Sequence, residues 1–141
     1  MLVAVYSRDG YVLLIERRRP FRFWQSVTGS LEEGEAPEDA ARRELEEETG
    51  LTGEGRLYTP GLSRQFTIDP RWLGNYAPGV RENVEYEWRY ELAERRDVRL
   101  APDEHTAFQW LPPSQAAATV WSWTNREALN ALPIRSAPSK P

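Results

Sequence analysis

The sequence predicts an α/β protein, a sandwich in which helices cover a mixed central sheet. Two apolar segments near the N-terminus, Leu2–Tyr6 and Tyr11–Glu16, are typical of strands. Asn83–Leu92 alternates polar and apolar residues, as a half-buried strand does. Between them, Pro37–Thr49 has the start and stop signals of a helix. A chain of 141 residues can form one domain with a real hydrophobic core.

The first two strands are predicted to form a hairpin. The turn Ser7–Gly10 separates the two apolar segments and ends in Asp-Gly, a common hairpin turn sequence. Trp24–Thr28 is predicted to be a further short strand. We therefore expect three strands before the helix.

The helix over Pro37–Thr49 has recognisable ends and one side that faces the core. Pro37 suits the first helical position, where its missing N–H loses no partner. Gly50 suits a left-handed C-terminal cap. Ala41 and Leu45 form a stripe that is expected to pack into the core.

Three glutamates of this helix lie on one side. At 100° per residue, Glu44, Glu47 and Glu48 fall within roughly 100° of one another, whereas Glu46 lies off this cluster. Three carboxylates on one face repel one another, and a bound divalent cation reverses that repulsion. The alternative is a solvated acidic surface, which is the usual explanation of a glutamate run.

Downstream of the helix the sequence predicts more strands, a long loop and two short helices. Pro and Gly residues mark the loop, and long ordered loops are often functional. In order, the predicted elements are strand Arg64–Ile68, loop Asp69–Arg81, strand Asn83–Leu92, strand Ala107–Leu111, helix Ser114–Thr119 and a last helix to Leu132, capped by Thr124 with Glu127 three residues on. Residues 1–135 are expected to form the domain and residues 136–141 a disordered tail.

The composition argues against several classes of function. The chain has no cysteine, which excludes a disulfide, a thiolate zinc site and a cysteine nucleophile. Its net charge of −4 argues against general nucleic-acid binding. No apolar run is long enough for a signal peptide or a membrane span. We therefore expect a cytoplasmic enzyme without a membrane or nucleic-acid partner. The sequence leaves the oligomeric state open.

The segment around the glutamates resembles the signature of the Nudix hydrolases. It places Gly29, Glu35, Arg43-Glu44-Leu45, Glu47-Glu48 and Gly50-Leu51 at the spacings of that signature, with no position missed. The resemblance implies a Nudix-type α/β/α sandwich and hydrolysis of a diphosphate linked to another group. It also implies a magnesium cofactor, for which manganese can substitute.

Motifs outside this segment resemble one branch of the family, the bacterial dihydroneopterin triphosphate pyrophosphatases. These motifs are Phe23–Ser30, Tyr76–Val80, Glu104-His105 with Trp110-Leu111, and Trp121–Arg126. The branch hydrolyses dihydroneopterin triphosphate to the monophosphate and pyrophosphate in folate biosynthesis. One alternative is a nucleoside triphosphate pyrophosphohydrolase that acts on dATP-like substrates. A remote alternative is a Nudix domain that binds a nucleotide without catalysis, which the retention of every signature glutamate disfavours.

The resemblance also assigns roles to individual residues. It implies that Glu44, Glu48 and Glu104 hold the metal, and that Glu47 or Glu104 takes a proton from the attacking water. Arg43 belongs to the expected catalytic set. The implied substrate contacts are Arg17, Thr28, Gly29, Phe66, Thr67, Ile68, Asp69 and Ser122. Aromatic faces for the pterin ring are expected from Phe66, Trp121 and Trp123.

Some of these expectations have a structural alternative. Ser122 is as well suited to cap a helix as to contact a ligand. His105, the only histidine, is expected to have a structural role in preference to that of a general base. The family also has about ten residues ahead of the first strand, including a basic residue near the substrate. Because this sequence starts at Met1, we expect a truncated or misassigned start, or a phosphate contact supplied differently.

Overall fold

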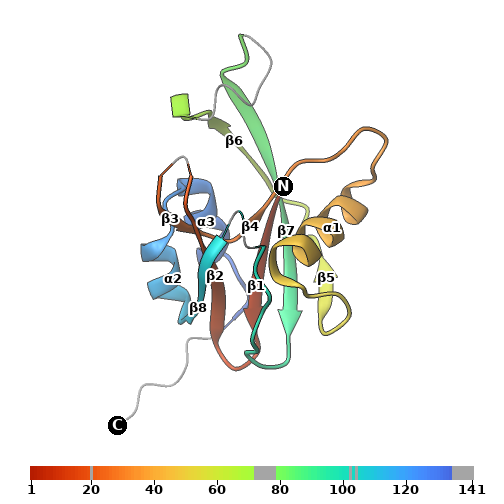
Figure 1. Ribbon diagram of the computed structural model, residues 1–141, viewed down its shortest axis with the longest axis vertical. Coiled ribbons are helices and arrows are strands. Elements are labelled where there is room, and N and C mark those ends of the chain that lie inside the picture. The colour runs from red at the N-terminus through yellow and green to blue at the C-terminus, as the bar shows by residue number, and fades with distance from the viewer. Residues whose placement is uncertain (20, 72–78, 102, 104, 135–141) are drawn as a thin grey trace.

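The computed structural model describes residues 1–19, 21–71, 79–101, 103 and 105–134 (Figure 1). Within this part of the chain, eight strands form a mixed sheet and three helices lie against it. The strands are β1 Leu2–Ser7, β2 Tyr11–Arg17, β3 Phe23–Gln25, β4 Val27–Thr28, β5 Arg56–Tyr58, β6 Ser63–Thr67, β7 Glu82–Leu92 and β8 His105–Leu111. The helices are α1 Pro37–Thr49, α2 Pro113–Thr119 and α3 Trp123–Asn130.

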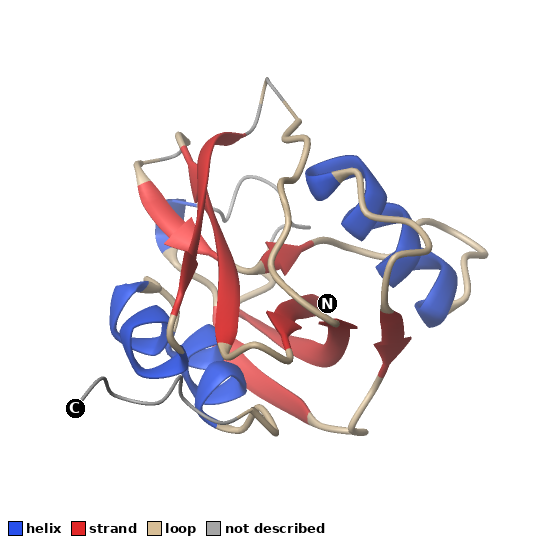
Figure 2. Cartoon of the chain, turned by 90° about the horizontal axis from the view of Figure 1, so that it is seen from below, coloured by secondary structure: helices blue, strands red, loops and turns tan. Residues whose placement is uncertain are grey.

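The sheet is mixed, as the sequence predicts. β1 pairs with β2 antiparallel and with β7 in parallel. The order through the centre is β3-β2-β1-β7-β5, with β8 paired to β2, β6 to β7 and β4 to β1. α1 packs on one face, and α2 and α3 pack on the other (Figures 1 and 2). The predicted α/β/α sandwich is therefore confirmed.

α1 begins and ends at the predicted residues, Pro37 and Thr49. Gly50 has a φ of 75°, and its N–H donates to the carbonyl four residues earlier at 2.8 Å, so it caps the helix in the left-handed conformation. Ala41 and Leu45 are buried in the core cluster that joins α1 to β1, β2 and β7. Burial of this stripe fixes the rotation of the helix, and with it the direction of its glutamates.

Two strand predictions are wrong in detail. Trp24–Thr28 is not one strand but two, β3 and β4, because the N–H of Ser26 donates to the side chain of Asn125 at 2.9 Å. β3 consequently pairs with β2, and β4 pairs with β1. β5 was not predicted at all. It has three residues, of which only Leu57 is buried, and so short a segment shows no periodicity.

The predicted cap of the last helix is also wrong. The N-cap of α3 is Ser122, whose hydroxyl accepts from the N–H of Asn125, whereas Thr124 is buried within the first turn. Glu127 forms an ion pair with Arg64 at 3.1 Å instead of closing a capping box. Two hydroxyl residues two positions apart both fit the capping pattern, so the sequence alone does not choose between them. The remaining predicted elements are present with ends shifted by one or two residues.

Several elements meet at one end of the sheet, beside α1. β1 begins there opposite the end of β4, and β7 passes the same point.

The predicted loop Asp69–Arg81 is described only at residues 69–71 and 79–81, and Glu104 and the predicted tail 136–141 lie outside the described residues. Among the helices described, none is both long and apolar enough to cross a membrane.

Candidate active site

Gly29 and Glu44 fit together where α1 passes the end of β4. The N–H of Gly29 donates to the carbonyl of Met1 at 3.0 Å, which ties this point to β1. A Cβ on Gly29 would lie 2.2 Å from the carboxyl carbon of Glu44 and 2.5 Å from one of its oxygens. The absence of a side chain on Gly29 therefore leaves the space in which the Glu44 carboxylate lies.

Arg43 ties the loop before α1 to the helix. Its guanidinium donates two hydrogen bonds of 2.9 Å to Glu35, one of 2.9 Å to the carbonyl of Ser30 and one of 2.9 Å to Glu44. A longer contact of 3.4 Å reaches Glu47. The hydrogen bond from Arg43 lowers the pKa of Glu35 to about 2, so this pair is ionised at neutral pH. Because each nitrogen of Arg43 donates to a protein group, the geometry suits a role in positioning Glu44.

Glu48 is buried beside His105. Each residue is 3% exposed, and Nε2 of His105 lies 3.2 Å from one carboxylate oxygen of Glu48. Burial, assisted by the positive charge of Arg17, lowers the pKa of His105 to about 4. The imidazole is therefore neutral at neutral pH and offers Glu48 no positive charge. A buried neutral histidine suits the structural role expected of it.

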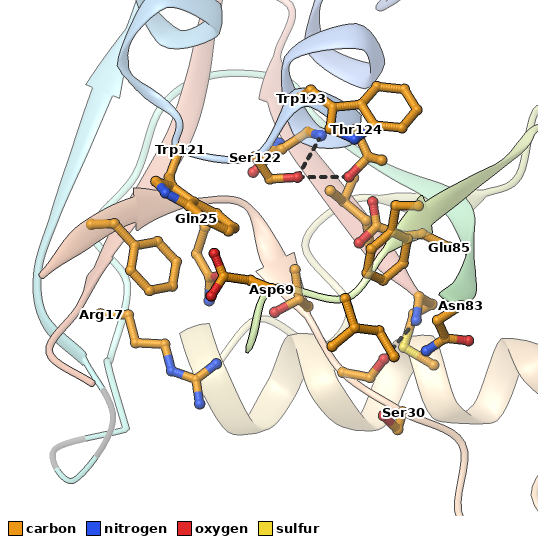
Figure 3. Close-up of a pocket in the computed structure, with 18 of the residues that line it drawn as sticks. Arg17, Gln25, Ser30, Asp69, Asn83, Glu85, Trp121, Ser122, Trp123 and Thr124 are labelled. Carbon is orange, nitrogen blue, oxygen red and sulfur yellow. Dashed lines mark hydrogen bonds between the residues drawn. The ribbon is translucent and has the colours of Figure 1, made fainter. Parts of the chain in front are cut away.

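A cavity of about 670 Å³ lies between α1 and the start of α3 (Figure 3). This volume is typical of small-molecule sites, which span roughly 300–1,000 Å³. Glu44 and Glu48 line the cavity. In Figure 3, Arg17 lies on the α1 side and Trp123 lies farther from that helix. The predicted substrate contacts all line the cavity: Arg17, Thr28, Gly29, Phe66, Thr67, Ile68, Asp69 and Ser122.

The expected metal site is only partly described. Glu44 and Glu48 share the cavity wall, but the side chain of Glu47 is 57% exposed and does not line the cavity. Glu104 lies outside the described residues. Among the residues described, no group of three or more histidine, aspartate or glutamate side chains is placed to hold a metal ion. The donors present are carboxylate oxygens, which is the donor type that hard divalent cations take.

Asp69 lines the cavity and forms an ion pair with Arg71. The Arg71 guanidinium donates to both carboxylate oxygens of Asp69, at 2.9 and 2.8 Å, and lowers the pKa of Asp69 to about 2. The same guanidinium lies 3.6 Å from the ring centroid of Phe21 and 5.5 Å from that of Trp121. These cation–π contacts join the segments after β2, after β6 and before α3.

Polar residues that the sequence analysis missed also line the cavity. The side-chain nitrogen of Gln25 is buried and has no hydrogen-bond partner among the residues described. Leaving a buried donor unpaired costs about 1–3 kcal/mol, which a ligand acceptor would offset. No local pattern marks Gln25, because its place in the cavity follows from the break between β3 and β4. The missed polar residues are Gln25, Ser30, Asn83, Glu85, Thr124, Asn125 and Arg126.

The polar face of β7 did carry a signal in the sequence. The alternation of β7 was interpreted only for its apolar positions, yet Val84 and Tyr86 are 40% and 57% exposed. The polar positions Glu87 and Arg89 are instead buried, at 1% and 7% exposed. Buried charges on a strand indicate ion pairs or a site, and the half-buried Glu85, on the same face of the strand, lines the cavity.

Gly29→Ala is expected to weaken metal binding without unfolding the protein. The added methyl group must displace the Glu44 carboxylate from its place against Gly29. Disturbing a group that orients a metal ligand typically lowers affinity about 10- to 100-fold. Titration calorimetry with Mn²⁺ measures this affinity directly. Gly53→Ala is the matched control, since a Cβ there meets nothing within 4 Å. Equal Mn²⁺ affinities in the two variants would exclude Glu44 as a metal ligand.

Comparisons with known proteins relate the chain to one family. A family model described as NUDIX domain matches residues 1–132. The chain is 38% identical over 141 residues to the dihydroneopterin triphosphate diphosphatase of Escherichia coli (strain K12), covering 97% of this chain and 93% of that protein. It is 33% identical over 133 residues to the Haemophilus influenzae protein of that name, covering 92% and 83%. The solved structure of the E. coli dihydroneopterin triphosphate pyrophosphohydrolase matches with a TM-score of 0.86 at 38% identity, covering 92% of this chain and 90% of that chain.

Proposed function

We propose that this chain, which belongs to the Nudix hydrolase family, hydrolyses dihydroneopterin triphosphate to dihydroneopterin monophosphate and pyrophosphate in folate biosynthesis. The observation that carries the proposal is the shared cavity. Every residue that the resemblance assigns to the substrate lines it, together with Glu44 and Glu48. Two relatives at 38% and 33% identity have names that state this activity.

Nudix hydrolases generally use divalent metal ions. In the proposal Glu44 and Glu48, with Glu104, would hold Mg²⁺, for which Mn²⁺ can substitute, since all the donors are oxygens. When bound, the cation neutralises phosphate oxygens and lowers the pKa of a bound water. Arg43 keeps the Glu44 carboxylate in position through its 2.9 Å hydrogen bond.

The chain's own side chains bind the triphosphate and remove a proton. Arg17 lies on the α1 side of the cavity, where its planar guanidinium can pair with phosphate oxygens (Figure 3). A carboxylate, Glu47 or Glu104, accepts the proton of the attacking water. The water attacks phosphorus at the bridge between the α- and β-phosphates, and the bridging P–O bond breaks. The products are the monophosphate and pyrophosphate, and no covalent intermediate with the protein forms.

The ring of the substrate is assigned to the wall farther from α1. Trp121 and Trp123, which are 41% and 47% exposed, line this part of the cavity, and Phe66 also lines the cavity. Flat aromatic faces with a few polar groups suit a hydrogen-bonding bicyclic ring. The same exposed faces would also stack a purine, which keeps a nucleoside triphosphate pyrophosphohydrolase as the second candidate.

Product analysis tests the reaction. Wild-type protein, dihydroneopterin triphosphate and Mg²⁺ are expected to give pyrophosphate and the monophosphate in equal amounts, measured by phosphorus NMR. The same mixture with excess chelator is the control and is expected to give neither product. Release of orthophosphate in place of pyrophosphate would contradict the proposed position of attack. No turnover of this substrate would overturn the proposal.

A further inference from the structure

Glu85 is a carboxylate of the cavity that the proposed mechanism does not use. It lies on β7 and lines the cavity near the start of α3. Figure 3 shows it below Thr124 and across the cavity from Arg17. It is thus placed near the proposed ring position and away from the residue proposed to bind phosphate.

Two hydroxyl groups at the start of α3 lie on the same side of the cavity as Glu85 (Figure 3). The N–H of Asn125 donates to the Ser122 hydroxyl at 3.5 Å, and the hydroxyls of Ser122 and Thr124 lie 2.7 Å apart. The Thr124 hydroxyl lowers the pKa of the Glu85 carboxylate, against the larger effect of burial. A carboxylate has about four acceptor positions, so Glu85 can accept hydrogen bonds from a ligand.

The surroundings of Glu85 favour a ligand that donates hydrogen bonds. Arg64 lies opposite it on β6, but the Arg64 guanidinium donates to Glu87 at 2.6 Å and to Glu127 at 3.1 Å. Burial raises the pKa of Glu85, despite the opposing effects of the Thr124 hydroxyl and of the positive charges of the Met1 amino group and Arg64. A carboxylate partly removed from water gains most from N–H groups that replace its lost solvation.

An aromatic surface lies beside this carboxylate. The register of β6 and β7 pairs Phe66 with Asn83, two residues from Glu85 and on the same face of the strand. All three residues line the cavity. A flat ring stacked on Phe66 would therefore turn one edge toward Glu85.

We propose that Glu85 is a specificity-determining residue that accepts two hydrogen bonds from a fused ring that contains a 2-aminopyrimidin-4-one unit, such as a pterin or guanine. One comes from the ring N–H and the other from the adjacent exocyclic amino group, a donor pair that matches two carboxylate oxygens. Adenine instead has a ring acceptor beside its amino group and lacks this pair. The proposal rests on the proposed function and names the edge of the substrate that the cavity recognises.

The first test compares substrates in Glu85→Gln. An amide keeps the shape of the side chain and one acceptor oxygen, but removes the charge and the other acceptor oxygen. The kcat/KM for dihydroneopterin triphosphate is expected to fall about 10- to 100-fold, with little change for dATP. Glu82→Gln is the matched control, because Glu82 lies on the same strand, is exposed and does not line the cavity. An equal fall for both substrates, or no fall for either, would overturn the assignment.

The second test needs no variant and separates this proposal from the proposed function. dGTP and dITP differ only in the exocyclic amino group, so the wild-type protein is expected to have a kcat/KM about tenfold or more higher for dGTP. In Glu85→Gln this ratio is expected to approach one. A wild-type ratio near one would overturn the role of Glu85. Poor activity of the wild type on dihydroneopterin triphosphate would overturn the proposed function, while the nucleotide ratio would still decide the role of Glu85.

Discussion

Glu48→Gln is expected to lower kcat by at least about 100-fold while the protein stays folded. Glu48 lines the cavity and is 3% exposed, so its carboxylate is held in one place. Glutamine has nearly the same shape but no charge, and therefore binds a divalent cation far less well. Loss of a metal ligand or an acid–base group typically lowers turnover by this amount or more.

The matched control is Glu46→Gln, on the same helix but exposed. Turnover at saturating Mg²⁺ should stay near wild type in this control. Thermal unfolding should show that Glu48→Gln is at least as stable as the wild type, because it removes a buried charge. Near wild-type turnover in Glu48→Gln would exclude Glu48 as a metal ligand.

The parts of the fold that were predicted from the sequence depend on local signals. Pro37 and Gly50 act through their own backbone geometry, so both ends of α1 could be placed to the residue. The break at Ser26 depends on Asn125, 99 positions away, and no local pattern reveals such a partner. The parallel pairing of β1 with β7 is likewise a long-range contact.

For the candidate site as well, the sequence predicts the residues that have local signals and misses those that depend on long-range contacts. The spacing of the signature glutamates is local to one helix, and Glu44 and Glu48 line the cavity as that spacing suggests. The hydrogen bonds of Arg43 depend on the path of the loop that carries Glu35 and Ser30. The spacing of the signature residues does not predict that path. The sequence analysis did not identify Glu85, because it considered only the apolar positions of the segment that forms β7. Its place in the site depends on the long-range folding that brings β7 and the start of α3 to the same cavity.

The second large effect is expected in the choice of substrate. A site built to hydrogen-bond one ring leaves its buried polar groups unpaired when another ring binds. Gln25 and Glu85 are such groups in this cavity. The wild-type kcat/KM should therefore be at least about 100-fold higher for dihydroneopterin triphosphate than for dATP.

A side-by-side measurement of these two kcat/KM values at the same Mg²⁺ concentration tests the central claim most directly. Both reactions release pyrophosphate in the proposal, so one coupled pyrophosphate assay measures both on the same scale. A clear preference for dihydroneopterin triphosphate is the predicted result. Equal or higher efficiency on dATP would contradict it and would assign the chain to the nucleoside triphosphate pyrophosphohydrolases.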